Sequence, residues 1–367
     1  MVQPLSKRTY YFDALRIVAI GAIVLLHVAG SYWYKLPVST LDWQVTNLYD
    51  CITRWGVPVF VMISGALFLD PAREQPIKKI WTKNIPKLVR LLIFWGFLYA
   101  LVYNLPPSWS GEDIALFIHE MLFGTPHLWF LFMLLGLYVL IPIVRCITAN
   151  ETAMRYFLVV AFVMNFVAPI STGGGTIPAV QEFVDAFMIQ LPLGYSFYFV
   201  LGYYLSSHNI SRTVRYATYI LAIITLGLAT VISSGVSLAQ GSASTFVIQH
   251  HYPFMFAAAA VFIAVKQHFI RQMKAPQDDL TPYLADNPHR SDKENERLEM
   301  LQELSSCTLG VYVIHIFVLR FLIGLGIDPI GFASIITMPL MALAVLAISF
   351  GIAYVLKRIP FLGKYFV

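Results

Sequence analysis

Residues 10–34 read YYFDALRIVAIGAIVLLHVAGSYWY, an apolar run that contains three ionisable residues, Asp13, Arg16 and His27. At about 100° per residue, Arg16 and His27 lie within about 20° of each other around a helix, and Asp13 shares that face one turn earlier. His27 lies about 16 Å along the axis from Arg16, beyond the middle of a membrane span. Ionisable residues at such depth are costly and usually mark a functional site. We therefore expect a polar line along one face of the first helix.

The chain as a whole is strongly hydrophobic. Hydrophobic residues make up 58% of the 367 residues and charged residues 12%, which excludes a soluble enzyme with an ordinary polar surface. Apolar runs of about 17 to 25 residues recur, as membrane-crossing α-helices require, whereas barrel strands would be shorter and would alternate. The first run is too long for a cleaved signal peptide. The sequence predicts an all-α, polytopic membrane protein with one integral-membrane domain over residues 1–367. The predicted spans are 10–34, 48–69, 85–103, 128–147, 154–170, 187–205, 214–233, 252–270, 307–327 and 334–356.

The basic residues indicate how these spans are oriented. Lys and Arg in the connections fall almost entirely on one alternate set, and the opposite set holds only Lys35. Because cytoplasmic connections are enriched in Lys and Arg, this pattern predicts about ten transmembrane helices with both termini in the cytoplasm. It also accounts for the formal charge of +5 without a nucleic-acid partner, since the basic residues form no single patch. The long connection 273–303 would be a cytoplasmic linker that ends in a charged surface helix.

A second basic group follows the first cytoplasmic connection, in the sequence KKIWTKNIPKLVR at 78–90. Lys87 and Arg90 are three residues apart and share a helix face, and Lys83 lies one turn earlier. With Arg16, these side chains form a candidate site for phosphate groups, which guanidinium and ammonium groups bind well. The lysine pair 78–79 is more simply explained as a topology signal or a contact with anionic membrane lipids.

Other polar residues are predicted near the opposite membrane face and in the ninth span. Arg54 follows Asp50 by one helical turn, so the two residues either neutralise each other or bind substrate. His127 and Trp129 begin the fourth span, where aromatic residues commonly anchor a helix at the interface. His315 lies within the ninth span and is a candidate for lining the same cavity. The sequence contains no CxxC spacing and no other obvious ligand cluster, so we expect no metal.

Four segments together resemble the bacterial membrane acyltransferase-3 family over nearly the whole chain. The spacing between Arg16 and His27 resembles the hallmark of the family's first helix. The other three segments are RWGVPVFVMISGALF at 54–68, HLWFLF at 127–132 and SSCTLGVYVIH at 305–315. The resemblance implies acetyl-CoA or another acyl-CoA as co-substrate, and a glycan or other extracytoplasmic hydroxyl as acceptor. It also implies an essential histidine in the first helix.

These implications give each candidate residue a role. An imidazole, whose ordinary pKa is about 6.5, can take a proton from a hydroxyl near neutral pH or attack a thioester itself. We expect a catalytic group of His27, Arg16 and Asp13. We expect acyl-CoA to contact Arg16, Lys83, Lys87 and Arg90. We expect the acceptor to lie near Arg54, His127, Trp129 and His315.

The alternative hypothesis is a transporter or flippase of a lipid-linked saccharide, in which intramembrane Arg and His would bind the substrate. On either hypothesis the partners are a glycan or lipid-linked saccharide and membrane lipids, with no nucleic acid, and the location is the bacterial inner membrane. Some relatives carry a further extracytoplasmic domain, and this chain would be the membrane module alone. The sequence does not reveal the oligomeric state, the acceptor or the size of the acyl group.

Overall fold

The computed structural model describes residues 9–105, 110–167, 194–245, 247, 252–272, 291–330 and 333–365. All regular structure in these ranges is helical, and they contain no strand, which confirms the all-α prediction. The first part of the chain forms α1 (Tyr10–Gly30), α2 (Leu41–Thr53), α3 (Gly56–Phe68), α4 (Ile77–Lys79), η1 (Ile80–Asn84), α5 (Ile85–Tyr103), α6 (Gly111–Phe123), η2 (Pro126–Leu128) and α7 (Trp129–Thr148). The second part forms α8 (Glu151–Phe162), η3 (Val163–Val167), α11 (Tyr195–Ser207), α12 (Arg212–Gln240), α14 (Tyr252–Gln272), α15 (Asp292–Gly324), α16 (Ser334–Arg358) and α17 (Pro360–Tyr365).

Within the described residues, seven helical stretches are long and apolar enough to cross a membrane, of which one joins α2 to α3 and another joins α4, η1 and α5. They are Tyr10–Gly30, Leu41–Phe68, Ile77–Tyr103, Pro126–Thr148, Arg212–Gln240, Asp292–Gly324 and Ser334–Arg358. A shorter apolar helix covers Phe254–Ile270, and α8 and α11 fall within the predicted spans 154–170 and 187–205 or overlap them. The protein is therefore a polytopic membrane protein, while the total of ten spans and the side of each terminus stay predictions.

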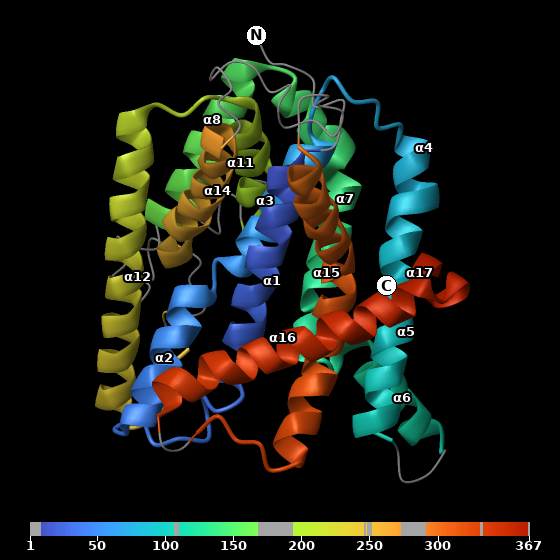
Figure 1. The fold of residues 1–367 in the computed structure, drawn as a ribbon, viewed down its shortest axis with the longest axis vertical. Helices are drawn as coiled ribbons and strands as arrows, with labels where there is room; N and C mark the ends of the chain where they lie inside the picture. The colour runs from blue at the N-terminus through green and yellow to red at the C-terminus, as the bar shows by residue number, and fades with distance from the viewer. Residues whose placement is uncertain are drawn as a thin grey trace.

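Helix α1 lies in the middle of the bundle (Figure 1). It packs against α15, α3, α2 and α16, and its side chains Leu15, Ala19 and Ile20 are completely buried. Helix α12 forms one edge of the bundle, and α5 with α6 forms the other. Helix α16 crosses the bundle obliquely, so that α17 lies against α5 (Figure 1). The polar line predicted on the first helix is thus surrounded by other helices.

The second predicted span is broken into two helices. We expected one continuous span over 48–69, but α2 ends at Thr53 and α3 begins at Gly56. Pro58 explains the break, because proline has no N–H to donate to the carbonyl of Arg54 and its ring clashes with that carbonyl in a continuous helix. Arg54 consequently lies at the C-terminal end of α2, beside the break.

Two glycines allow α3 and α11 to pack with their backbones in contact. A Cβ atom on Gly65 would lie 1.7 Å from the carbonyl oxygen of Phe199, and one on Gly202 would lie 2.0 Å from the carbonyl oxygen of Met62. No side chain fits at either position, so the close approach depends on glycine, as at many helix contacts inside membranes.

The third predicted span, 85–103, is preceded by a further helical segment. Residues Ile80–Asn84 form a π-turn that joins α4 to α5. Pro86 at the start of α5 cannot donate to the carbonyl of Thr82, which favours a locally wider turn. The π-turn contains Lys83 and Asn84, so it determines where these two side chains lie.

Helix α15 joins two segments that we expected to be separate. The charged sequence after residue 291 continues without interruption into the predicted span 307–327 and forms one helix of 33 residues. A capping box between Ser291 and Glu294 fixes its start. The preceding part of the predicted linker, 273–290, lies outside the described residues.

Two basic side chains donate hydrogen bonds to backbone carbonyls at the C-terminal ends of α3 and α11. Arg145 donates to the carbonyls of Phe68 and Asp70 at 2.7 and 2.8 Å, beyond the end of α3. Lys266, which is buried, donates to the carbonyls of Leu205 and Ser206 at 2.8 and 2.9 Å, at the end of α11. Helix termini leave carbonyls without intrahelical partners, and a cation satisfies them well. These two residues therefore hold the ends of α3, which packs on α1, and of α11, which packs on α3.

Candidate active site

Asp13 and Arg16 form a polar group with a residue from α15. The Arg16 guanidinium contacts the Asp13 carboxylate at 3.0 Å, and the Ser305 hydroxyl donates to the same carboxylate oxygen at 2.6 Å. Asp13 is 1% exposed, so its charge depends on these partners for stabilisation. Ser305 was not a predicted site residue. It begins the segment 305–315 that carries part of the family resemblance, but nothing in its spacing indicates a contact with α1.

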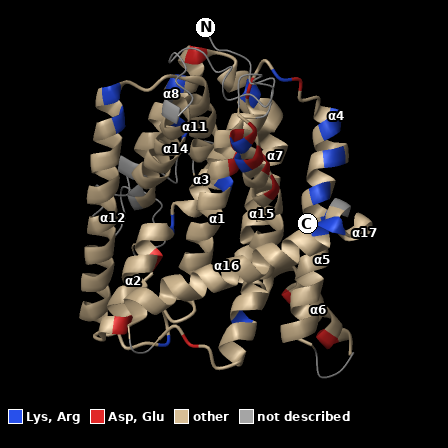
Figure 2. Ribbon diagram, in the orientation of Figure 1, with Lys and Arg blue, Asp and Glu red and all other residues tan. Residues whose placement is uncertain are grey.

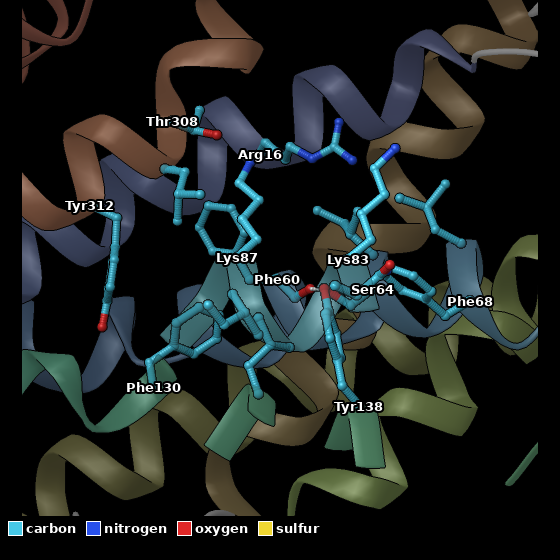
Figure 3. A pocket seen from close by; sticks show the side chains of 16 residues that line it. Arg16, Phe60, Ser64, Phe68, Lys83, Lys87, Phe130, Tyr138, Thr308 and Tyr312 are labelled. Carbon is cyan, nitrogen blue, oxygen red and sulfur yellow. Dashed lines mark hydrogen bonds between the residues drawn. The ribbon is translucent and has the colours of Figure 1, made fainter. Parts of the chain in front are cut away.

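A cavity of about 350 Å³, here called the basic cavity, lies beside Arg16. Lys83 and Lys87 line it together with Arg16, and Figure 3 shows these three side chains extending along one side of it. Phe130 and Tyr138 of α7 lie on the other side (Figure 3). The cavity therefore combines cationic groups with an apolar, aromatic wall, an arrangement that suits a long molecule with an anionic end and a less polar arm.

Arg90 is the one predicted donor-site residue that is not among the residues that line this cavity. Its side chain is exposed on α5. Lys87, one turn earlier, does line the cavity, so the shared helix face does not bring both residues to the same place. A role for Arg90 in donor binding stays a prediction.

A second cavity of about 270 Å³, here called the outer cavity, includes His27. Arg54 and Trp129, two of the predicted acceptor-site residues, also line it, and so does Asp50. Two further aromatic residues, Tyr195 and Tyr198 of α11, complete one wall. These tyrosines were not predicted as site residues, because sequence gives no indication that α11 faces α1 and α2.

Asp50 and Arg54 form the ion pair that their spacing suggested. Arg54 Nε and one terminal nitrogen contact the two carboxylate oxygens of Asp50 at 2.6 and 2.8 Å. Asp50 is 2% exposed, whereas the Arg54 side chain is 22% exposed. The pair is thus bidentate and still presents part of the guanidinium to the outer cavity. Both predicted roles, mutual neutralisation and substrate contact, are compatible with this geometry.

One ring nitrogen of His27 forms a hydrogen bond with a backbone carbonyl of its own helix. Its Nδ1 lies 2.8 Å from the carbonyl oxygen of Ile23. A carbonyl only accepts hydrogen bonds, so Nδ1 carries the hydrogen in this contact. In the neutral ring Nε2 then has the free lone pair, which is the form that can remove a proton from a hydroxyl.

Two further histidines from distant parts of the chain surround His27. The ring centroids of His27 and His315 are 4.9 Å apart, those of His127 and His315 are 5.4 Å apart, and those of His27 and His127 are 6.2 Å apart. His127 and His315 are 4% and 0% exposed. Neither is among the residues that line the two cavities, so a direct contact of either with the acceptor stays a prediction.

Three aromatic rings form the end of the basic cavity that lies nearest the histidines. The ring centroids of Phe60 and Phe130 are 6.3 Å apart, and those of Phe130 and Tyr312 are 5.3 Å apart. All three residues line the basic cavity. Tyr312 is one turn before His315, and its hydroxyl donates to the backbone carbonyl of His127. We call Phe60, Phe130 and Tyr312 the aromatic layer.

The order of residues along three helices shows that the two cavities are arranged end to end. On α1, Arg16 lines the basic cavity and His27 the outer one. On α3, Val57 and Pro58 line the outer cavity, whereas Phe60, Ser64 and Phe68 line the basic one. On α7, Trp129 lines the outer cavity, whereas Phe130 and Tyr138 line the basic one. The aromatic layer and the histidines therefore lie between the cavities.

No group of three or more His, Cys, Asp or Glu side chains able to hold a metal ion is found in the described part of the chain. The three histidines do not form such a group, and the Nδ1 atoms of His27 and His315 each contact a backbone carbonyl. The expectation of a metal-free site stays a prediction.

The comparisons with known proteins agree with the resemblance seen in the sequence. The model of the acyltransferase-3 family, described as an acyltransferase domain, matches residues 9–358, nearly the whole chain. No match was found among the curated proteins or among the solved structures.

Proposed function

Because the chain belongs to the acyltransferase-3 family, we propose that it transfers an acyl group, most simply acetyl, from cytoplasmic acyl-CoA to a hydroxyl of an extracytoplasmic or lipid-linked glycan. The enzyme would act in the bacterial inner membrane. The observation that carries this proposal is the end-to-end arrangement of a basic and an outer cavity with His27 near their junction. Such an arrangement lets a donor and an acceptor approach one histidine from opposite membrane faces.

The basic cavity is the proposed donor site. Arg16, Lys83 and Lys87 would bind the phosphate groups at the nucleotide end of acyl-CoA, because these groups are polyanionic. The pantetheine arm would lie along the aromatic wall and place the thioester beyond the aromatic layer. The axial distance from Arg16 to His27, about 16 Å, is comparable to the length of that arm. Asp13 would hold Arg16 in place through their ion pair.

The outer cavity is the proposed acceptor site. Sugar rings stack on aromatic side chains and form hydrogen bonds with charged groups, and this cavity offers both. The ring centroids of Trp129 and Tyr195 are 5.5 Å apart, and Arg54 lines the same cavity. We place the acceptor hydroxyl beside His27. We propose enterobacterial common antigen as the first acceptor to test, on a suggested likeness to its O-acetyltransferase that the comparison with curated proteins does not support.

In the proposed reaction, His27 carries one proton from the acceptor hydroxyl to the CoA thiolate. His27 Nε2 removes the proton of the acceptor hydroxyl as its oxygen attacks the thioester carbonyl carbon. The carbon–sulfur bond breaks, the ester forms, and His27 returns the proton to the CoA thiolate. In a covalent variant, His27 Nε2 attacks the thioester carbon and CoA leaves as its thiolate; the acceptor oxygen then displaces His27 from the acyl carbon, and the hydroxyl proton passes to the thiolate. A stable acyl adduct at His27, detected by peptide mass spectrometry, would select the covalent variant.

The experiment that tests this function uses the purified protein in lipid nanodiscs with acetyl-CoA labelled in the acetyl group. We expect release of free CoA thiol and transfer of label to a glycan acceptor. Mass spectrometry of surface glycans from a deletion strain would identify that acceptor through the loss of the acyl mass. If no donor is consumed with any glycan, while the protein moves a lipid-linked saccharide across the bilayer, the transporter hypothesis replaces this one.

A further inference from the structure

His315, which the sequence suggested as a substrate contact, is buried against the ring of His27. It is 0% exposed and is absent from the linings of both cavities. Its Nε2 lies 3.2 Å from Nδ1 of His27. A side chain in this position touches the proposed base and not the substrate.

The backbone of α15 determines which nitrogen of His315 carries hydrogen. Its Nδ1 lies 2.6 Å from the carbonyl oxygen of Tyr312 and 3.2 Å from that of Val311. Carbonyl oxygens accept and do not donate, so Nδ1 of His315 is the protonated nitrogen. In the neutral ring, Nε2 of His315 therefore presents a lone pair to His27.

The hydrogen on Nδ1 of His27 consequently has two acceptors. The carbonyl oxygen of Ile23 lies 2.8 Å from this nitrogen, and Nε2 of His315 lies 3.2 Å from it. If Nε2 of His27 carried the hydrogen instead, Nδ1 would carry a lone pair. That lone pair would face the carbonyl oxygen of Ile23 and the lone pair on Nε2 of His315, with no hydrogen between them. Buried polar atoms without a hydrogen-bond partner are costly, so the alternative tautomer is disfavoured.

We propose that His315 is a positioning residue that, together with the carbonyl of Ile23, holds His27 in the tautomer with Nδ1 protonated and Nε2 free, and that supports the positive charge His27 acquires during transfer. When His27 has taken the proton of the acceptor hydroxyl, its Nδ1–H becomes a charged donor, and hydrogen bonds from charged donors are about twice as strong as neutral ones. His315 receives this bond without leaving its own helix. The inference rests on the proposed function of His27 as the base.

The test compares two substitutions at one position in the full-length protein. In His315→Leu the acceptor is removed and the volume is roughly kept, whereas in His315→Gln the amide oxygen can still accept from Nδ1 of His27. We expect kcat of His315→Leu to fall by about 10- to 100-fold, the range that loss of a buried hydrogen-bond acceptor gives. KM for acyl-CoA should not change. His315→Gln should recover most of the lost rate.

A spectroscopic measurement separates positioning from simple packing. In the protein labelled with ¹⁵N-histidine, the His27 signals, assigned by their loss in His27→Gln, should show Nδ1 protonated in the wild type and in His315→Gln. In His315→Leu, where only the carbonyl of Ile23 still accepts from Nδ1, the share of the other tautomer should rise. All variants must elute as monodisperse protein and bind CoA as the wild type does.

Three results would overturn the inference. They are an unchanged kcat in His315→Leu, an unchanged His27 tautomer in that variant, and a rise in KM for the acceptor with kcat preserved, which would make His315 a substrate contact. Failure of the proposed function gives a different result: His27→Ala would then still transfer the acyl group. The tautomer of His27 would in that case still report whether His315 controls the ring.

Discussion

Arg16 and His27 lie on one face of α1, yet they line different cavities. The aromatic layer separates them, so the polar line predicted on the first helix consists of two sites with different tasks. Arg16 contacts Asp13, which Ser305 also contacts, at the end that would bind anions, and His27 lies with two other histidines where chemistry would take place. Substitutions at the two ends should therefore have different kinetic effects.

Lys87→Ala should weaken binding of acyl-CoA and leave the chemical step nearly unchanged. Lys87 lines the basic cavity, far along α5 from the histidines, and a contact with phosphate at an exposed site contributes about a three- to tenfold change in affinity. We expect KM for acyl-CoA to rise by this factor while kcat stays within about twofold.

Arg90→Ala is the matched comparison, because Arg90 lies on the same helix but is absent from the cavity lining. It should change KM less than Lys87→Ala does. Steady-state kinetics with acyl-CoA varied and acceptor saturating would measure both variants. An unchanged KM for Lys87→Ala would remove the basic cavity from the donor site.

Single residues with a local sequence signal were predictable, and their tertiary partners were not. The depth of His27 and Arg16 in an apolar run, and the i,i+4 spacing of Asp50 and Arg54, both point to groups that the structure shows in polar contacts. Ser305 contacts Asp13 across 292 residues of sequence, and such a contact follows from how α15 packs on α1. One sequence contains no information on that packing beyond apolar periodicity.

At the scale of elements, α3 connects the two cavities. Its first turn lines the outer cavity, its middle contributes Phe60 to the aromatic layer, and its end lines the basic cavity. Gly65 sets its distance from α11, and Arg145 fixes its C-terminal end. The position of α3 would therefore control the width of the proposed path between donor and acceptor.

Gly65→Ala should destabilise the fold. Its added Cβ would overlap the carbonyl oxygen of Phe199, and overpacking of this kind costs about 1–3 kcal/mol. Gly136→Ala on α7 is the control, because a Cβ there meets nothing within 4 Å. Thermal denaturation in detergent, followed by size-exclusion chromatography, should show a lower midpoint for Gly65→Ala only. Equal midpoints would mean that α3 and α11 do not pack as closely as described.

Phe60→Ala should widen the aromatic layer and admit longer acyl groups. Each added methylene in a tight apolar site changes discrimination by about 1–3 kcal/mol, so kcat/KM for butyryl-CoA relative to acetyl-CoA should rise by at least about tenfold. Phe68→Ala serves as control, since Phe68 lines the same cavity two turns farther from the histidines. Competition between the two donors, with products weighed by mass spectrometry, measures the ratio. An equal rise in Phe68→Ala would move the selective constriction away from the aromatic layer.

The apolar runs predicted where the helices lie. They did not predict where a helix is interrupted or where two segments form one helix. The interruption at Arg54 and the π-turn at Ile80–Asn84 both follow from prolines that are visible in the sequence, Pro58 and Pro86. A proline in an apolar run is nevertheless compatible with a kink, a break or a regular helix start, and tertiary packing decides between them. The oblique course of α16 likewise depends on the surfaces of α1, α2 and α15.

At the scale of the whole molecule, charge is distributed unevenly along the bundle. Figure 2 shows many Lys and Arg residues toward the end of the bundle at which α1 begins, around α4, α8 and the start of α12. Because cytoplasmic ends are enriched in these residues, this end would face the cytoplasm, and the basic cavity would open toward the compartment that supplies acyl-CoA.

The predicted topology can be tested by a reporter placed at each end of the chain. A fusion after residue 367 should report the cytoplasm, as should one before residue 1. A control fusion in the connection between α1 and α2, near Lys35, should report the opposite side. If the C-terminal fusion reports the extracytoplasmic side, the number of spans is odd, and the donor and acceptor sites must be reassigned to membrane faces.

His27 would perform the transfer between two separate binding sites. The most direct measurement determines CoA affinity and glycan acylation on the same folded preparation of His27→Ala, with Arg16→Ala beside it. We expect His27→Ala to bind CoA as the wild type does and to transfer no acyl group, because the proposed phosphate contacts, Arg16, Lys83 and Lys87, line the basic cavity and not the outer one. Arg16→Ala should lose affinity and transfer together. Substantial acyl transfer by His27→Ala would contradict the account.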